Sequence, residues 1–445
     1  MNLQRSVFQS KRAYLLLALY IATAAYFFVL FGSINDVVFC CDATLYVRGS
    51  ELLQQSGVLA DTYLSGYRPI SNYAFVAVTR SIGLVFADGS SDVSSFLQQD
   101  APFVIGSIAL MLAIGTLLIV WLGEQKGFME SFCAIFLNPL VFAHVPVPLQ
   151  ESQMVLVLGP LVLVSYVMLR SGRTNRAALA LMIFAAAAWM TKPSFILCAA
   201  ATLALAVYVL AKHWNIRSSR AMFAGLMAMA LIVFPQIYAM KERLGTFNPY
   251  PNSEVLNMQL SWGNDMWRYE THVVPAQNSA VGLAFETGFP PVEADQFINS
   301  LSQEPVKAIS LFLGHIVGAL DYTHLTTYIH AGSPGFPPTN IAVGAALFLA
   351  LILWITRILE RRYGLSDLYL DILAVGAAAP LLIAAVETRF SLPLVMAFAP
   401  RTIEWFTATG EPPHRKARDV FGALVFGLVF ATAIAVMRST VEPFR

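Results

Sequence analysis

The feature that most constrains this chain is a set of apolar stretches that are too long to cross a membrane only once. A helix rises about 1.5 Å per residue and the hydrocarbon core of a bilayer is about 30 Å thick, so one crossing takes roughly 20 residues. Three stretches would extend roughly 50–65 Å each as single helices. They run over residues 128–170, 177–211 and 368–406. Each of them must therefore fold back once.

Each long stretch is interrupted near its middle by proline and by charge. The interruptions are "HVPVPLQES" (144–152), "MTKPSF" (190–195) and "VETRFSLP" (386–393). Proline lacks a backbone donor, and it also keeps the residue before it out of the helical region. These three segments are therefore the predicted turns.

The other long apolar segments suit single crossings. They are residues 13–33, 102–122, 221–240, 341–356 and 420–437. With two crossings from each long stretch, the sequence predicts an all-α polytopic membrane protein of about 11 transmembrane helices. Composition agrees, because 57% of the residues are hydrophobic and only 12% are charged, whereas average soluble domains carry about 25% charged residues. A net charge of +1 gives no indication of a nucleic-acid partner.

The basic residues of the short loops predict the orientation, because they favour the cytoplasmic side. With the predicted crossings, all the basic segments fall on one side. These segments are residues 5–12, 170–176, 212–220, 357–362 and 414–418. The extracytoplasmic side of a plasma (inner) membrane then carries the three charged turns, a first outer loop over 35–101 and a large outer loop over 241–340. The chain 1–445 is expected to form a single transmembrane domain.

The segment "PVKAISLFLGHIVGALDY" (305–322) offers an alternative, because it is apolar enough for a twelfth span. A crossing there would move "RILERR" (357–362) to the outside and break the charge rule. We therefore expect a non-spanning helix on the outer surface, so that the outer-face loops carry short helices.

Five ionisable residues from distant points of the chain are predicted to meet at the outer membrane face. They are Asp42, Glu151, Lys192, Glu387 and Arg389. Ionisable groups at membrane depth usually face a protein interior or a watery cavity. The simplest arrangement is one cavity at the outer surface, lined by acids and bases.

Asp42 has two interpretations. It lies four residues before Tyr46, so a helix over 42–55 would place both residues on one face. The acid could then act as a general base in a cleft at membrane level. It could equally cap the helix that starts with "ATLYVRGSELL". Asp36 is the nearby competitor for the catalytic role.

The other charged residues also have structural interpretations. Glu151 suits the start of a helix, where the dipole favours an acid. Lys192 either extends its amine to the interface or binds a phosphate as a point charge. Arg389 either pairs with Glu387 or reaches a lipid-linked phosphate.

Nucleotide and zinc sites have no support in the sequence. The chain has no P-loop and no G-x-G-x-x-G segment after a strand. The histidines of the large outer loop, His272, His315, His324 and His330, have a spacing that suits no standard zinc site. A membrane-embedded substrate that carries a phosphate fits the charges better than a soluble nucleotide does.

At four places the sequence resembles the GT-C superfamily of membrane glycosyltransferases. "DATLYVRGSELLQQSG" (42–57) is similar to the first outer loop of these enzymes, in which an acid and a tyrosine lead into a helix that ends at glycine. "TKPSF" (191–195) resembles their Lys-Pro turn, and "ETRFSLPLVMAFAP" (387–400) resembles their Glu-x-Arg-aromatic-x-x-Pro segment. "QEPVKAISLFLGHI" (303–316) resembles their proline-headed outer helix. Order and topology match over the whole chain, and specific residues match at these four places.

The resemblance implies transfer of a monosaccharide from a polyprenyl-phosphate donor to a lipid-linked glycan, a lipopolysaccharide or a protein at the outer face. It implies that Asp42 deprotonates the acceptor or binds a metal, in which case the cofactor would be Mg²⁺ or Mn²⁺. Glu151 stands where many members have a second acid, although "QES" (150–152) departs from a clear aspartate.

The resemblance also implies a donor site. Lys192 and Arg389 would hold the donor phosphate, and Tyr46 and Glu387 would be further substrate-binding residues. No soluble module for glycan binding is expected, because the chain ends soon after its last predicted span.

Two other classes of membrane protein remain as alternatives. A transporter or flippase of lipid-linked sugars usually shows internal repeats and polar residues at mid-membrane, and the sequence shows neither. An O-antigen polymerase or ligase would also carry a large outer loop, but the Asp-x-x-x-Tyr start of the first loop argues against that class.

Overall fold

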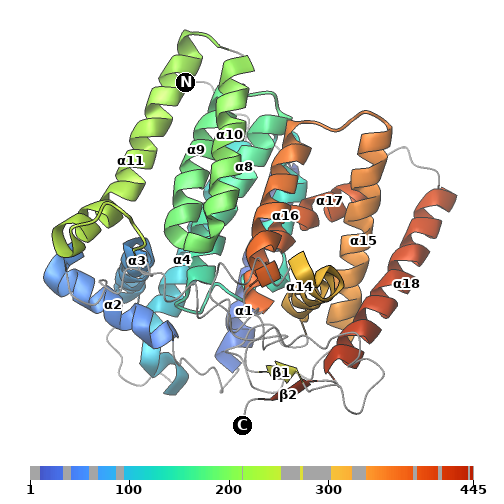
Figure 1. Ribbon diagram of the computed structural model, residues 1–445, viewed down its shortest axis with the longest axis horizontal. Coiled ribbons are helices and arrows are strands. Elements are labelled where there is room, and N and C mark those ends of the chain that lie inside the picture. Colours follow the sequence, from blue (N-terminus) through green and yellow to red (C-terminus); the bar gives the residue numbers. More distant parts are fainter. Residues whose placement is uncertain are drawn as a thin grey trace. The chain divides into compact units, whose positions relative to one another are not determined.

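The computed structural model is helical apart from one pair of short strands in the residues that it describes. Those residues are 11–33, 42–59, 69–86, 95–212, 214–251, 271–273, 302–322, 337–383, 388–408, 413–438 and 441–443. The main helices of the first half are α1 (Lys11–Ser33), α2 (Asp42–Ser56), α3 (Ile70–Phe86), α4 (Ser95–Leu122), α5 (Phe128–Phe136), α8 (Gly159–Arg170), α9 (Thr174–Thr191), α10 (Ile196–Lys212) and α11 (Ile216–Leu244). Those of the second half are α14 (Pro305–Ala319), α15 (Pro337–Leu359), α16 (Leu365–Ile383), α17 (Leu392–Thr407) and α18 (Pro413–Arg438) (Figure 1).

Short helical segments complete the described chain. They are η2 (Gly57–Leu59), α6 (Pro139–Phe142), α7 (Gln150–Gln153), η4 (Met154–Leu158), η5 (Pro193–Phe195) and η7 (Thr388–Ser391). The strands β1 (Thr271–Val273) and β2 (Val441–Pro443) pair antiparallel, with Thr271 opposite Pro443.

The chain divides into two compact units. The first contains α1 to α11 together with residues 364–372, which begin α16. The second contains α14, α15, the remainder of α16, α17, α18 and the strand pair.

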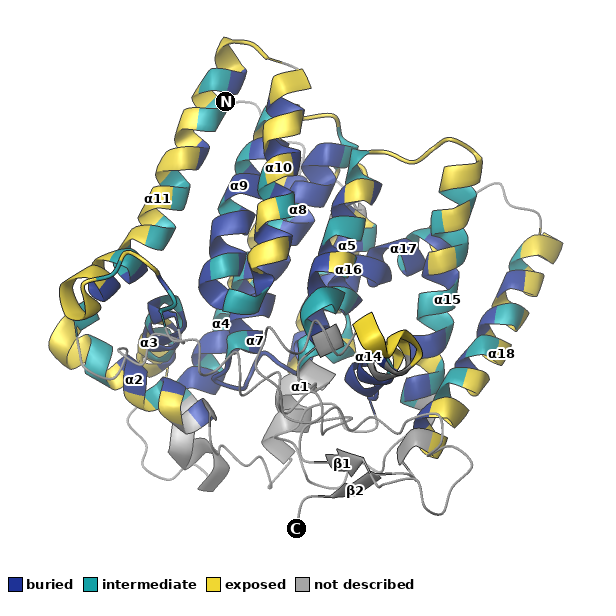
Figure 2. Cartoon of the chain, in the orientation of Figure 1, coloured by how far each residue is buried: buried dark blue, intermediate teal, exposed yellow. Residues whose placement is uncertain are grey.

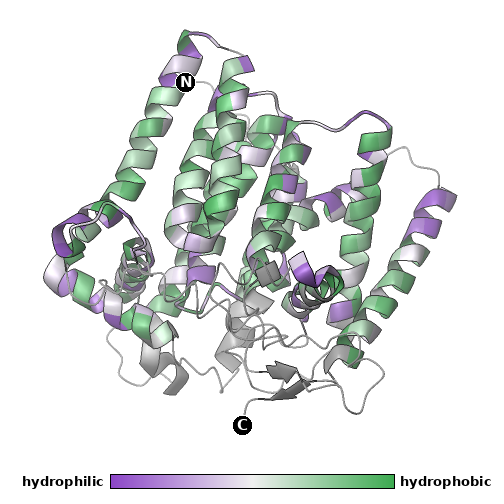
Figure 3. Ribbon diagram, viewed as in Figure 1, coloured by the Kyte–Doolittle hydropathy of each residue, from purple (hydrophilic) through white to green (hydrophobic). Residues whose placement is uncertain are grey.

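Six of the described helices are long and apolar enough to cross a membrane. They cover Pro102–Leu122, Gln150–Arg170, Pro193–Lys212, Ile216–Leu244, Thr339–Leu359 and Pro413–Val436. Figure 3 shows that such helices, among them α10 and α15, are hydrophobic through most of their length. Many of their apolar side chains are exposed, and Figure 2 shows this along α11. These features fit a polytopic membrane protein.

The predicted count of about eleven crossings is not matched in the described residues. The segment 128–143 was expected to cross, but Asn138 and Pro139 end α5 after nine residues, or about 14 Å at helical rise. One helix in each of the other two predicted hairpins is also short, since α9 has 18 residues and α17 has 16.

All three predicted turns coincide with breaks between helices. In the first, residues 143–149 are non-helical and separate α6 from α7. The stretch 177–211 folds into α9 and α10, which are separated at Lys192 and Pro193. The stretch 368–406 folds into α16 and α17, with η7 before α17. The helix expected over 305–322 is α14, whose 15 residues rise about 22 Å and are therefore too short for a crossing of about 30 Å.

One element was not expected from the sequence. Residues 70–86, assigned to the first outer loop, form the 17-residue apolar helix α3. It packs closely on α4. A Cβ added at Gly83 would overlap the backbone of Pro102, and one added at Gly106 would overlap the backbone of Thr79. Small residues on both helices thus let the two backbones approach.

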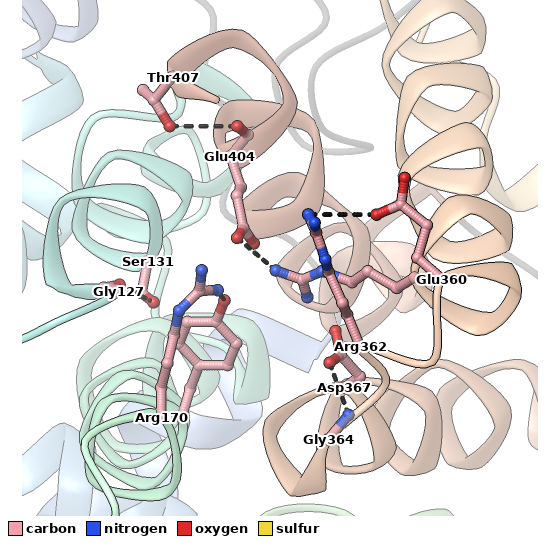
Figure 4. A network of polar contacts seen from close by, with 11 residues as sticks. Gly127, Ser131, Arg170, Glu360, Arg362, Gly364, Asp367, Glu404 and Thr407 are labelled. Atoms are coloured by element: carbon pink, nitrogen blue, oxygen red, sulfur yellow. Dashed lines mark hydrogen bonds and ion pairs between the residues drawn. The ribbon is translucent and has the colours of Figure 1, made fainter. Parts of the chain in front are cut away.

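In the second unit, α15 is the central element. It packs on both α17 and α18, and its Gly344 faces Gly427 and Phe430 of α18. At its end, Arg357 forms an ion pair with Glu404 of α17, and both side chains are largely buried (Figure 4).

Candidate functional site

The candidate site lies at one end of the helices α8 to α11 in the first unit. Short connections, residues 171–173 between α8 and α9 and the described residues 214–215 before α11, join consecutive helices. The helices therefore alternate in direction, and α9 contacts α8, α10 and α11 (Figure 1). The basic turns are therefore at one end of the helices. Glu151 and Lys192 are at the opposite end.

Helix α3 joins the segments that carry three predicted site residues. Its Tyr73 ring lies 5.7 Å from the Tyr46 ring of α2. Its Asn72 amide donates to the carbonyl of Thr191, next to Lys192, at 3.2 Å. It also contacts α7, which contains Glu151.

An apolar cluster holds these elements together. Its buried members are Ala43 and Tyr46 of α2, Ile70, Tyr73 and Val76 of α3, Phe103 of α4, Val147 and Leu149 before α7, and Ala239 and Met240 of α11. Fully burying an apolar side chain of this size contributes about 1.5–3 kcal/mol. The cluster thus brings five separate chain segments together.

Asp42 is the first residue of α2. The helix runs through Tyr46, so the two positions are one helical turn apart, as the sequence predicted. Tyr46 is buried, and its ring packs on the Tyr73 ring. The side chain of Asp42 lies outside the described residues, and so does Asp36.

Glu151 is more deeply buried than a residue that begins a helix at the membrane surface needs to be. It lies in the first turn of α7 and is 1% exposed. Ser152 and Gln153 beside it are also buried, as is His144 before α7. Buried carboxylates are rare and need compensation, and Glu151 does interact with its surroundings. The helix N-terminus also favours a negative charge at this position.

A π-helical segment follows Glu151. In η4 the amide of Gly159 donates to the carbonyl of Met154, five residues earlier. Pro160 comes next and offers no amide to the regular pattern. π-Helical turns of this kind occur frequently at functional sites.

Lys192 ends α9 as its C-cap and is half-buried. Its backbone is extended, with φ −147° and ψ 121°, as expected for a residue before proline. Its amide donates to the carbonyl of Ala188 at 3.1 Å. A cation at the carbonyl end of a helix is favoured by the helix dipole.

In the second unit, η7 carries Arg389. A buried polar network anchors this turn: the Tyr322 hydroxyl lies 2.8 Å from Ser391 Oγ, and the Tyr322 amide donates to Asn340 Oδ1 at 2.7 Å. Asn340 Nδ2 donates in turn to Asp321 Oδ1 at 3.1 Å. Phe390 packs on Ala319 and Leu381.

The two remaining site predictions depend on side chains that are not described. The backbone of Arg389 is part of η7, but its side chain lies outside the described residues, as does all of Glu387. The expected convergence of Lys192 and Arg389 therefore stays a prediction. In the residues that are described, no group of three or more His, Cys, Asp or Glu side chains could hold a metal ion.

Several residues of the site were not anticipated from the sequence. Ser71, Asn72 and Tyr250 contact the last turn of α9, and Gln236 contacts both α3 and the segment before Tyr250. A signal did exist for the tyrosine, because "NPYPNS" (248–253) is a turn-rich segment directly after α11.

No family model, curated protein or solved structure matches this chain.

Proposed function

We propose that this chain transfers a monosaccharide from a polyprenyl-phosphate donor to an acceptor at the extracytoplasmic face of the plasma membrane. The acceptor is a lipid-linked glycan, a lipopolysaccharide or a protein. The observation that carries the proposal is the arrangement around α3. This helix contacts α2, which begins at Asp42, α7, which contains the buried Glu151, and α9, which ends at Lys192. Glu151 and Lys192 are at the end of α8–α11 opposite the basic turns.

The residue types suit this reaction. The acceptor hydroxyl oxygen attacks the anomeric carbon, and the bond from that carbon to the phosphate oxygen breaks. The polyprenyl phosphate leaves with the electron pair, and the hydroxyl proton passes to a carboxylate. Asp42 is the proposed base or metal ligand, and Glu151 is the second acid. The ammonium of Lys192 stabilises the charge that develops on the leaving phosphate, as a point charge can.

Arg389 and Glu387 are further proposed donor-binding residues. Arg389 supplies a guanidinium suited to bind phosphate oxygens with two hydrogen bonds, and Glu387 and Tyr46 contact the substrate. The anchored backbone of η7 supports this part of the proposal, because a phosphate ligand gains from a turn that is already ordered.

The direct test uses purified protein in liposomes with a panel of defined polyprenyl-phosphate monosaccharides and lipid-linked glycan, lipopolysaccharide and protein acceptors. Mass spectrometry should detect glycosylated acceptor and free polyprenyl phosphate in equal amounts. Lys192→Ala should lower this release strongly. Lys212→Ala, at the basic end of α10, should not. If no donor yields product while a labelled donor crosses the vesicle membrane, the chain is a flippase and the transferase proposal fails.

Sidedness has its own test on α11. Cysteines are placed singly at Ile216 and Asn248, which are exposed and are near opposite ends of this helix, in a variant without native cysteines. An impermeant maleimide should label position 248 in intact cells and position 216 only after lysis. Labelling in the reverse order would place the site on the cytoplasmic side.

A further inference from the structure

The carbonyl end of α9, directly before Lys192, has an unusual set of partners. A helix leaves its last four carbonyls without amide partners inside the helix, and the next residues usually satisfy some of them. Here Pro193 has no amide to offer. Within the described part of the chain, Ala188 is the only one of the four whose carbonyl receives a backbone amide, which comes from Lys192.

Side chains from two distant segments bind the other three carbonyls. The Tyr250 hydroxyl donates to the carbonyl of Trp189 at 2.9 Å. Ser71 Oγ donates to the carbonyl of Met190, and Asn72 Nδ2 donates to the carbonyl of Thr191 at 3.2 Å. Every carbonyl of the last turn of α9 therefore has a donor.

The three donors are themselves fixed by one buried amide. Gln236 of α11, 2% exposed, accepts from the Ile70 amide at 2.9 Å and donates to the Pro249 carbonyl at 2.8 Å. Ile70 directly precedes Ser71 and Asn72, and Pro249 directly precedes Tyr250. The Trp189 and Tyr250 rings also pack edge to face, with centroids 6.2 Å apart.

This arrangement does more than end a helix. The carbonyl end of a helix carries roughly half a negative charge, which would repel a phosphate held by the next residue. Donors on these carbonyls offset that charge and also fix the turn from which the Lys192 side chain extends. We propose that Ser71, Asn72 and Tyr250 are positioning residues that hold Lys192 for the phosphate of a polyprenyl-phosphate ligand, an inference that rests on the proposed function.

The Tyr250 hydroxyl keeps its role as a donor over a wide pH range. Burial raises the pKa of Tyr250 above its ordinary value of 10.0, because the phenolate would lose solvation. The phenol therefore remains protonated throughout the physiological range.

The test is a double-mutant cycle on binding of a short-chain polyprenyl phosphate without sugar, measured by thermophoresis in detergent. Tyr250→Phe, which removes only the hydroxyl, should weaken binding roughly 2- to 10-fold, the effect of one neutral hydrogen bond. In the Lys192→Ala background it should change nothing further, because the group it positions is gone. Ser71→Ala should also weaken binding in the wild-type background and not in the Lys192→Ala background. It replaces Tyr250→Phe in the cycle if Tyr250→Phe is poorly folded. Tyr238→Phe, which removes a more exposed hydroxyl from α11, should leave binding unchanged.

Two results would overturn the inference: equal effects of Tyr250→Phe with and without Lys192, or a lower melting temperature with unchanged affinity. If the wild-type chain binds no polyprenyl phosphate, the proposed function fails. The positioning of Lys192 is then decided by acylation of its amine with an N-hydroxysuccinimide ester, followed by peptide mass spectrometry. Tyr250→Phe should change the rate at Lys192 and not at Lys212, and an unchanged rate at Lys192 overturns the positioning role.

Discussion

Replacing Gln236 with leucine should destabilise the first unit more than any exposed Gln→Leu change. The side chain is 2% exposed and makes two hydrogen bonds, one from the Ile70 amide and one to the Pro249 carbonyl. Leucine has a similar volume but neither polar atom, so an amide and a carbonyl of the backbone are left buried without these partners. An unsatisfied buried polar group costs about 1–3 kcal/mol, which gives about 2–6 kcal/mol for the pair.

The measurement is the melting temperature of the detergent-solubilised protein, followed by size-exclusion chromatography after heating. Gln54→Leu is the matched control. Gln54 is exposed, and its one hydrogen bond, to Ser81, is 3.3 Å long, so its loss should cost less than about 0.5 kcal/mol. We expect the Gln236 variant to melt at least roughly 4 °C lower than the control. Equal melting temperatures would show that the two hydrogen bonds of Gln236, to Ile70 and to Pro249, do not stabilise the fold.

Three further outcomes are expected. Asp42→Asn should fold normally, since asparagine also suits a helix N-terminus, but should transfer sugar at least about 100-fold more slowly; near wild-type activity would leave Asp42 a structural residue. Gly106→Ala should cost about 1–3 kcal/mol of stability through overpacking of α3 on α4. Gly364→Ala should be nearly neutral in the same melting assay, because the nearest described atom to the added Cβ is Asp367 Oδ2, at 3.9 Å. Burial and the nearby Glu130 raise the pKa of Cys133 to about 11; the rate of its maleimide labelling should therefore increase about tenfold per pH unit from pH 8 to 10, and a plateau near pH 9 would contradict this.

The breaks in the helices could be predicted because their causes are local. Pro193 removes an amide and forces an extended backbone on Lys192, and these effects depend only on the neighbouring residues. The same reasoning applies to the stretch that contains Arg389. The crossing predicted over 128–143 was wrong because the prediction used only the length of the apolar segment. Pro139 indicates a helix break there, as the prolines of the predicted turns do.

Helix α3 could not be recognised in the same way. Its sequence "ISNYAFVAVTRSIGLVF" is largely apolar, but its 17 residues are fewer than the roughly 20 that one crossing takes, and Asn72, Thr79 and Arg80 interrupt it. It was therefore assigned to the first outer loop. Its polar residues are accommodated by tertiary contacts: Asn72 bonds a carbonyl 119 residues away, and Arg80 pairs with Glu51 at 2.9 Å. Such partners come from distant parts of the chain, so the local pattern of apolar and polar residues does not indicate them.

The candidate site shows the same division between local and tertiary causes. Glu151 and Lys192 were predicted as residues at helix ends, which is a local property. Their grouping through α3, and the supply of donors to α9 by Tyr250, depend on how distant segments pack.

The π-helical segment Met154–Leu158 fixes the direction in which Glu151 faces. Its i−5 hydrogen bond takes one more residue into the turn than an α-helix would. One residue corresponds to about 100° of rotation in an α-helix. Deleting a single residue from this segment would therefore restore a regular helix and turn Glu151 by about 100° relative to α8, away from the elements that now surround it. Conversely, related chains that keep an acid in this place need to conserve the length of the segment more strictly than its composition.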